Sequence, residues 1–249
     1  MQVEKKYKLS KIISVDVASG KEPLNLKFKA NKLDESNKSD FIGPGIYLIS
    51  YKAEVIYIGK YQPLNRGNIL LDRWIRHLET ITMRGFRVGF GKCKNKKTKF
   101  ESIQRIQDMH PLLTEIENLY KYNCEQRFRD TGIVTSMNRI AFAGNNWNDF
   151  RYANDSGILS NFELRLFRLD DLDSEMKAKD CVTEIEKKLL YKFKPRINKE
   201  YHDKDHSVIR GQNTIEKIVA ELKEIVKLYQ PARLSHCTVL TQSEHNTAE

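Results

Sequence analysis

The sequence predicts a mixed α+β fold, because short alternating segments and longer amphipathic segments occur in the same chain of 249 residues. Two apolar runs around a short polar turn, in GIYLISYKAEVIYIG at 45–59, are typical of a β-hairpin. A further strand signal, NFELRLFRL, has as its apolar positions Phe162, Leu164, Leu166 and Leu169. Three segments with apolar residues every three or four positions indicate helices, at about 69–80, 181–193 and 214–230.

The overall composition indicates a globular protein with an anionic partner. Apolar residues make up 40% of the chain, charged residues 31%, and the formal net charge is +10. Nucleic acid is the usual partner of such a chain, because Lys and Arg neutralise phosphates with release of counterions. The first residues have no apolar signal segment, and no apolar run approaches about 18 residues. We therefore expect a cytoplasmic protein without a membrane partner.

The part of the chain before and just after the hairpin is predicted from local patterns. Residues 1–42 are expected to form an N-terminal extension, with short strands at 12–17 and 24–30 where apolar and polar residues alternate. The helix that follows the hairpin has Asn68 as its expected cap. Its predicted buried stripe consists of Leu71, Trp74, Ile75 and Leu78.

The middle of the chain is strongly basic. Residues 84–99 contain two arginines and five lysines without an acidic residue. Helical segments are expected at about 99–109 and 112–122, because Pro111 separates them. From 123 to 160 no long apolar period is visible.

Three polar side chains on the predicted helices are candidates for chemistry. Arg73 and His77 lie four positions apart and share a helix face with Arg76, a pattern that in isolation usually marks a solvated basic face. Glu186 instead falls among the apolar residues of its helix. A buried carboxylate needs a partner, which is either an Arg or Lys side chain or a metal ion at a cleft.

Tyr47 and Tyr57 occupy the two strands of the hairpin, and their positions set a geometric condition. A two-residue turn at 52–53 with regular pairing would place Tyr47 opposite Ile58 and send the two tyrosines to opposite faces. If both tyrosines serve one site, we therefore predict a three-residue loop or a bulge near 51–54.

Together these residues resemble the GIY-YIG endonuclease superfamily. GIY at 45–47 and YIG at 57–59 match its motif, and LDRWIRH resembles the corresponding helix of phage group I intron homing endonucleases. The segment from Glu186 to Asn198, which ends in Lys-Pro-Arg-x-Asn, resembles the metal-ligand helix of the bacterial excision-repair nuclease subunit. FELRLFRLDD resembles the third strand of the family. The resemblance covers about 43–80 and 160–199.

The resemblance implies a core with a small three-stranded antiparallel sheet flanked by helices, formed by residues 43–90 and 160–199. Residues 91–159 would then be an insertion that recognises DNA, and 200–249 a C-terminal helical extension with a disordered tail.

The resemblance also implies a role for each matched residue. Glu186 would be the sole protein ligand of one Mg²⁺ ion per site, with Mn²⁺ as a substitute and no small-molecule cofactor. Tyr47 would activate the attacking water as general base. His77 would orient the nucleophile or Tyr47 through a hydrogen bond, and it is the base in the alternative assignment. Arg73 would hold the scissile phosphate.

The remaining matched residues would support the site. Lys60 would add positive charge beside the tyrosines, Tyr57 would position water or phosphate, and Asn198 would brace the end of the glutamate helix. Gly59 would allow close backbone packing near the phosphate. The expected DNA-binding residues are Arg76, Arg84, Arg87, Lys92, Lys94, Lys96, Lys97 and Lys99.

A metal-dependent endonuclease that cuts double-stranded DNA is therefore expected. A compact core with an embedded insertion is most similar to the type II restriction endonucleases of the superfamily. The alternatives are a homing, phage-defence or junction-processing nuclease, and a catalytically degenerate DNA-binding protein. Restriction enzymes commonly dimerise, so the helix at 214–230 is either a surface for a homodimer or packed on its own domain.

Overall fold

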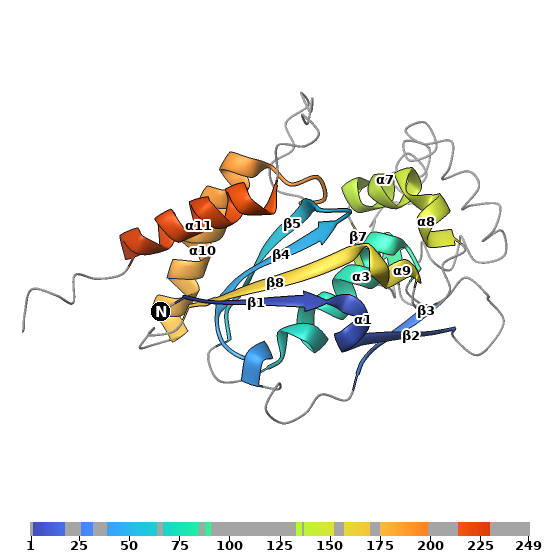
Figure 1. Ribbon diagram of the computed structural model, residues 1–249, viewed down its shortest axis with the longest axis horizontal. Coiled ribbons are helices and arrows are strands. Elements are labelled where there is room, and N and C mark those ends of the chain that lie inside the picture. Colours follow the sequence, from blue (N-terminus) through green and yellow to red (C-terminus); the bar gives the residue numbers. More distant parts are fainter. Residues whose placement is uncertain are drawn as a thin grey trace, which may run out of the picture.

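A four-stranded antiparallel sheet lies at the centre of the fold in this computed structural model (Figure 1). Across the sheet the strands are β1 (Gln2–Lys8), β8 (Phe162–Leu169), β4 (Gly45–Tyr51) and β5 (Glu54–Tyr61). The predicted class, a mixed α+β fold with a small antiparallel sheet and helices, is confirmed. The structure describes residues 2–17, 26–31, 39–63, 67–84, 88–90, 133–135, 137–151, 157–169, 175–198 and 214–229.

The N-terminal strand is the main departure from the expected sheet. β1 pairs antiparallel with β8 and adds a fourth strand to the three that were predicted. Tyr7 of β1 packs against the rings of Phe41 and Trp74, at centroid distances of 4.9 and 5.7 Å. The strand sequence QVEKKYK has few apolar residues, so its pattern gave no strand signal. Residues 2–8 therefore belong to the central sheet and not to an extension outside it.

The two short strands predicted near the N-terminus are confirmed. After the short helix α1 (Leu9–Ile12), β2 (Ile13–Val17) pairs antiparallel with β3 (Leu26–Ala30). The alternation in β3 matches its burial, because Leu26 and Phe28 are buried while Lys27 and Lys29 are exposed. A short 3₁₀ turn, η1 (Ser39–Phe41), then leads into β4.

The central sheet separates two apolar cores. On one face, Tyr47 and Ile49 of β4 pack with Trp74 and Leu78 of the helix that follows the hairpin. On the other face, residues of β4, β5 and β8 pack against α10 (Glu175–Phe193) and α11 (Ile215–Tyr229). Helices therefore flank both faces of the strands that carry the candidate site.

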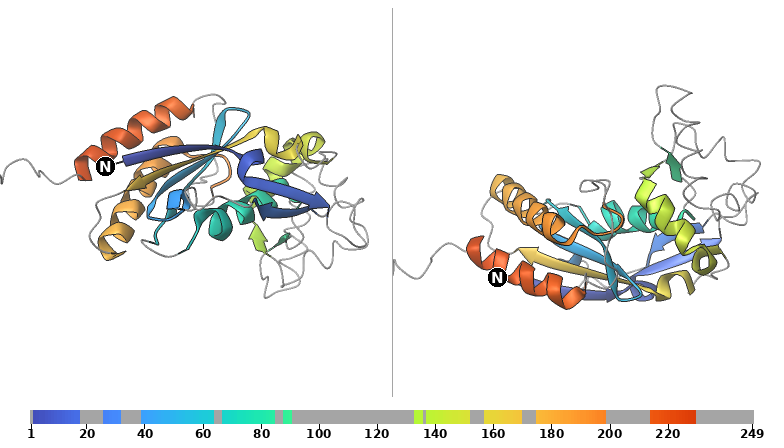
Figure 2. Two further views of the ribbon diagram at one scale, coloured as in Figure 1. Left: turned by 60° about the horizontal axis from the view of Figure 1, so that its bottom comes forward. Right: turned by 90° about the horizontal axis from the view of Figure 1, so that it is seen from above.

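Helix α11 packs on its own domain. Its described apolar residues are buried against α10 and the sheet, namely Ile215, Ile218, Val219, Leu222, Ile225 and Val226. The two helices lie side by side (Figure 2), and Lys192 of α10 donates to Glu221 of α11 at 2.5 Å. This apolar face is therefore not free for self-association. None of the helices in the described ranges is both long and apolar enough to cross a membrane.

The helix after the hairpin begins with a π-helical turn, η2 (Leu70–Trp74), and continues as α3 (Ile75–Thr82). The side chain of Asn68 accepts hydrogen bonds from the amides of Leu70 and Leu71, at 2.9 and 3.4 Å, as the expected cap does. The predicted buried stripe is wrong at Leu71, which is 54% exposed, while Leu70 is fully buried. In a π turn the hydrogen bonds run from i to i+5, so Leu71 falls out of line with Trp74.

The hairpin contains a bulge, as one of the two predicted alternatives required, but at a different position. Lys52 and Ala53 form a two-residue turn, both with positive φ of 48° and 65°, so the predicted three-residue loop is wrong. The register shifts further along β5, because Ser50 pairs with Val55 but Ile49 pairs with Tyr57. Ile56 is therefore the extra residue of a β-bulge, which lies beyond the predicted position at 51–54.

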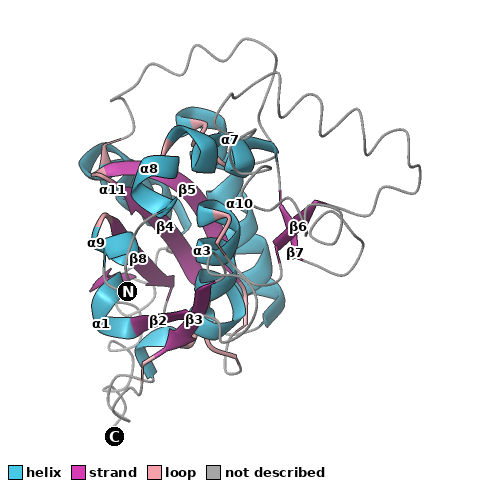
Figure 3. Ribbon diagram, turned by 90° about the vertical axis from the view of Figure 1, so that its right-hand side faces the viewer, coloured by secondary structure: helices cyan, strands magenta, loops and turns pink. Residues whose placement is uncertain are grey.

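Between Arg84 and Ser160 the structure describes residues 88–90, 133–135, 137–151 and 157–160 (Figure 3). β6 (Val88–Phe90) pairs parallel with β7 (Ile133–Thr135), and α7 (Met137–Asn145), α8 (Trp147–Arg151) and α9 (Gly157–Ser160) follow. No element was predicted from 123 to 160, because helices this short show less than three turns of an apolar period. The helices predicted at 99–109 and 112–122 lie outside the described residues.

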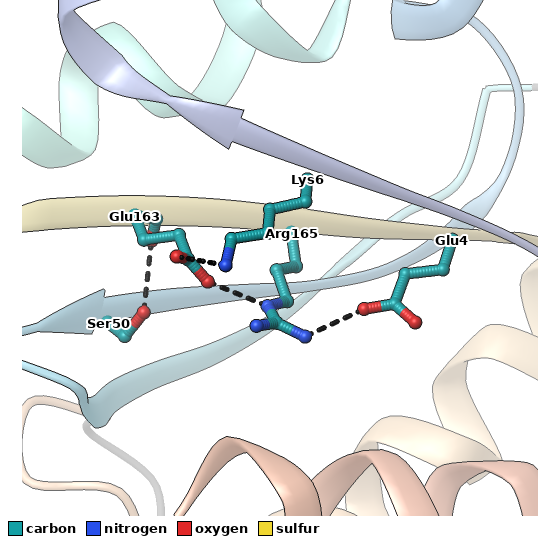
Figure 4. Close-up of polar contacts among 5 residues, drawn as sticks. All are labelled: Glu4, Lys6, Ser50, Glu163 and Arg165. Carbon is teal, nitrogen blue, oxygen red and sulfur yellow. Dashed lines mark hydrogen bonds and ion pairs between the residues drawn. The ribbon is translucent and has the colours of Figure 1, made fainter.

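A network of charged side chains joins β1 and β8 and reaches β4 (Figure 4). Arg165 donates to Glu163 at 2.7 Å and to Glu4 at 2.8 Å, and Lys6 pairs with Glu163 at 2.9 Å. The hydroxyl of Ser50 donates to the main-chain carbonyl of Glu163. Burial would raise the pKa of Glu163, but the hydrogen bonds from Arg165 and Lys6 outweigh it and the pKa is lowered. The partners are mutually satisfied, so this network is structural.

The hairpin turn provides a test of the fold. Ala53 has the left-handed conformation, in which a Cβ atom is unfavourable by about 1–2 kcal/mol and glycine is not. We expect Ala53→Gly to raise the free energy of unfolding by about 1 kcal/mol in urea denaturation. The matched control is Ala220→Gly on the exposed side of α11, which should lower it by about 1 kcal/mol. A loss of stability in both variants would contradict the assigned turn.

Candidate active site

Strands β4 and β5 bring the two motif tyrosines together. Because of the bulge, Tyr47 and Tyr57 lie on one face of the sheet, with their ring centroids 5.9 Å apart, which confirms the shared face. Gly59 lies opposite Tyr47, and a Cβ atom there would come within 2.5 Å of the Tyr47 ring. A Cβ at Gly45 would meet the carbonyl oxygen of Phe167 at 2.4 Å. Both motif glycines are therefore required by close packing, and the close neighbour of Gly59 is the tyrosine ring.

Helix α3 places His77 over the tyrosine pair. The Nε2 atom of His77 lies 2.7 Å from the Tyr47 hydroxyl, and its ring centroid lies 4.5 Å from that of Tyr57. Arg73 is exposed on the π-helical turn one turn earlier. Its positive charge opposes the rise in the pKa values of both tyrosines, although other groups have larger effects on each. Single π turns inside helices frequently occur at functional sites.

Arg139 of α7 completes this cluster and was not predicted. Its Nη2 lies 2.9 Å from Nδ1 of His77, and its Nη1 donates to the hydroxyl of Thr80 at 2.6 Å. The guanidinium carbon also lies 5.2 Å from the centroid of the Tyr57 ring. The expected catalytic core ended before this helix, and the sequence around Arg139 has no motif that would have marked it. The segment treated as an insertion therefore contributes a side chain to the candidate site.

Burial dominates the electrostatics of the cluster. It raises the pKa of Tyr47 well above its usual value of 10, and the neighbouring Tyr57 raises it further. The pKa of Tyr57 is also raised by burial, with opposing effects from Arg139 and from a hydrogen bond with Tyr47. Burial lowers the pKa of His77 well below 6.5, and Arg139, Arg73 and Arg76 lower it further. All three groups are therefore neutral near pH 7.

Glu186 approaches the same edge strand from α10. Its carboxylate forms an ion pair with Lys60 of β5 at 3.0 Å, and its side chain is 13% exposed. The prediction that it faces inward among apolar residues is consistent with the buried neighbours Val182 and Leu189. The negative charge of Glu186 raises the pKa of both Tyr47 and Tyr57, so it acts on the tyrosine pair from across the edge of the sheet.

The residues around Glu186 fit a magnesium site in which the protein supplies a single carboxylate. Mg²⁺ keeps several waters and is typically held by one or two carboxylates plus substrate phosphates. A single part-buried carboxylate beside the edge strand β5 provides that donor, and Lys60 shows that it accepts a cation at 3.0 Å. Within the described ranges, no three His, Cys, Asp or Glu side chains are grouped so that they could hold a metal ion by themselves.

Asn198 holds the edge strand in place. Its side-chain oxygen accepts from the amide of Ile58 at 3.0 Å, and its side-chain nitrogen donates to the carbonyl of Ile58 at 2.6 Å. The amide of Ile197 donates to the carbonyl of Ile56, the bulge residue, at 3.1 Å. The segment after α10 therefore binds β5 on both sides of Tyr57, which agrees with the bracing role expected for Asn198 but directs it to the strand.

The predicted DNA-binding residues fall into three groups. Arg76 is exposed on α3. Arg84 is only 3% exposed and donates to the main-chain carbonyl of Phe150, so it cannot contact DNA in this structure and that expectation is corrected. Arg84 follows Met83 at the end of α3, and its guanidinium is held against α8 by the carbonyl of Phe150. The others lie outside the described residues, namely Arg87, Lys92, Lys94, Lys96, Lys97 and Lys99.

Comparison of the chain with protein-family profiles, with curated proteins and with solved structures found no match. The assignment of function therefore rests on the motif residues and on the geometry described above.

The buried neutral state of His77 predicts a dependence of stability on pH. The unfolded chain takes up a proton on this histidine below about pH 6.5 and the folded state resists it. This contribution is fully present above about pH 6.5 and is lost as pH falls, by up to about 1.4 kcal/mol per pH unit. In urea denaturation between about pH 5 and 7.5, His77→Gln should show a weaker loss than the unmodified protein. If the free energy of unfolding depended on pH in the same way in both proteins, a buried neutral His77 would be contradicted.

Proposed function

We propose that this protein is a metal-dependent DNA endonuclease that hydrolyses phosphodiester bonds by GIY-YIG chemistry. The observation that carries the proposal is the grouping of Tyr47, Tyr57 and His77 beside an edge strand whose Lys60 is paired with Glu186. A phenol cluster, a carboxylate and an exposed arginine from separate elements can supply a base, a metal ligand and a phosphate-binding group for phosphodiester hydrolysis. The basic net charge of +10 supports a polyanionic substrate.

Arg73 is the phosphate-binding group in this proposal. It is exposed, and its fork of N–H donors matches two phosphate oxygens. It stands on the π-helical turn, one helical turn from His77, so a phosphate that it binds lies beside the tyrosine pair. Arg76 extends the positive charge along the same helix.

Tyr47 is the group that activates the attacking water. In the resting protein burial keeps its proton in place, because the pKa is well above 10. The charge of Glu186 adds to that effect, whereas the charge of Arg73 opposes it. A Mg²⁺ ion held by Glu186 would supply positive charge to the phosphate and the leaving oxygen and would cancel the carboxylate charge that keeps Tyr47 protonated. Lys60 occupies the carboxylate until then.

A restriction endonuclease of type II is the role that we favour. The core sheet and its two packed cores form one unit, and residues 91–159 lie between its strands in sequence, where a recognition insertion would be placed. Double-stranded DNA is the proposed partner, and any homodimer would use a surface other than the buried face of α11. Homing, phage-defence or junction-processing nucleases would use the same site.

The direct test is DNA cleavage with and without metal. Plasmid and phage DNA are incubated with the protein in Mg²⁺, in Mn²⁺ and in EDTA, and the ends are mapped. Discrete fragments are expected with Mg²⁺ and with Mn²⁺ but not with EDTA, and they would support a restriction endonuclease. Branch-selective nicking would favour junction processing, and DNA binding without any cleavage would identify a degenerate DNA-binding protein and contradict the proposal.

Glu186→Gln should bind DNA with unchanged affinity and cut it at least about 100-fold more slowly, because the metal contributes several kcal/mol to the transition state. The matched control is Glu184→Gln on the exposed side of the same helix, whose carboxylate only pairs with Lys188 at 3.9 Å. The control should cut DNA at the normal rate. Normal cleavage by Glu186→Gln would exclude the assigned metal ligand.

A further inference from the structure

We propose that Arg139 is a positioning residue that fixes the proton of His77 on Nε2, so that His77 donates a hydrogen bond to Tyr47. The catalytic consequence rests on the proposed nuclease function, whereas the position of the proton does not. Arg139 lies on α7, which packs against α3 through the first of the two cores. Arg139 is not part of the tyrosine motif, and it does not lie on α10, the helix that carries Glu186.

The hydrogen-bond chemistry of arginine determines the tautomer. A guanidinium has five N–H donors and no acceptor, so the 2.9 Å contact between Arg139 Nη2 and His77 Nδ1 requires a lone pair on Nδ1. A neutral imidazole with a lone pair on Nδ1 carries its proton on Nε2. The 2.7 Å contact between Nε2 and the Tyr47 hydroxyl is therefore a hydrogen bond that His77 donates.

The surroundings of His77 also oppose the imidazolium form. A proton on Nδ1 would point at the N–H group of Arg139. The charged groups that act on the ring are Arg139, Arg73 and Arg76, all of the same sign as an imidazolium. The remaining polar neighbours, Tyr47 and Tyr57, are neutral. His77 therefore has no free lone pair with which to take the proton of Tyr47 or of a water molecule.

This arrangement assigns the proton of Tyr47 as well. The Tyr47 oxygen accepts from His77, so its own hydrogen points elsewhere, and the hydrogen bond between the tyrosines raises the pKa of Tyr47 and lowers that of Tyr57. Once Tyr47 has released its proton to bulk water, the N–H of His77 remains in place to stabilise the phenolate. The base is Tyr47, and His77 is the donor that supports it.

Arg139 is held rigidly enough to perform this role. Its Nη1 donates to the hydroxyl of Thr80 at 2.6 Å, and that hydroxyl donates in turn to the main-chain carbonyls of Arg76 and His77, both at 3.0 Å. Its guanidinium also lies against the face of the Tyr57 ring. Two directed hydrogen bonds and one ring contact orient the guanidinium toward Nδ1.

The test is the tautomer of His77, measured by long-range ¹H–¹⁵N correlation spectra of ¹⁵N-labelled protein near pH 7, with His77→Gln used to assign the signals. The unmodified protein should show an unprotonated Nδ1 and a protonated Nε2. Arg139→Met, which removes the donors but keeps much of the side-chain volume, should shift His77 to a mixture of tautomers. Arg139→Lys should restore the Nε2–H form at least in part.

Phe142→Leu is the control for packing, because Phe142 is a buried α7 residue that contacts the Tyr51 ring and is not a hydrogen-bond partner of His77. It should lower stability and leave the tautomer unchanged. A Nδ1–H or imidazolium form in the unmodified protein, or an unchanged single tautomer in a folded Arg139→Met, overturns the proposal. If Arg139→Met does not fold, the spectra of the unmodified protein and Arg139→Lys decide.

Cleavage separates this inference from the proposed function. If the protein cuts DNA, Arg139→Met should lower kcat by about 100-fold with KM within about threefold, because the base loses its orientation. Absence of cleavage by the unmodified protein together with the predicted tautomers would contradict the nuclease function alone. Cleavage together with a Nδ1–H histidine would contradict the role of Arg139 alone.

Discussion

One extra residue in strand β5 determines whether a site can exist on this sheet. With regular pairing beyond the Lys52–Ala53 turn, Tyr47 and Tyr57 would point to opposite faces. Ile56 is the inserted residue, and it turns the next side chain of the strand onto the face that also carries Tyr47 and receives His77. The segment that ends in Asn198 binds the main chain on both sides of this point, so the irregular strand is held in one register. Every later contact of the cluster depends on that register.

The site joins two faces of the sheet at its edge. Tyr47, Tyr57 and His77 lie toward the core that contains α3, whereas Lys60 and Glu186 lie on the side of α10. β5 is the last strand of the sheet among the described residues, so no described strand separates the two groups. Burial keeps the phenols and the imidazole neutral, and the charges are arranged around them. The neutral tyrosines and His77 lie between Arg73 on one side and the Lys60–Glu186 pair on the other, an arrangement that suits a negatively charged substrate.

The local elements of the core could be predicted because their periods and turn residues are explicit in the sequence. The hairpin, the strand at 162–169, and the apolar faces of α10 and α11 follow from alternation and helical spacing. The shared face of the tyrosines could be stated as a condition, but the bulge residue could not be located, because Ile56 is as apolar as its neighbours. β1 and Arg139 could not be predicted, since a charged strand and a lone arginine gain their roles only from distant pairing.

The central claim is that Glu186, Arg73 and Tyr47 act on one phosphodiester. A crystal structure of the protein with a cleavable DNA duplex and Ca²⁺ in place of Mg²⁺ tests it most directly, because Ca²⁺ binds the same hard oxygen ligands. We expect one cation between a Glu186 oxygen and a phosphate oxygen, the same phosphate in contact with the Arg73 guanidinium, and the Tyr47 hydroxyl beside it. A DNA backbone that passes over another surface, or a cation bound away from Glu186, would contradict it.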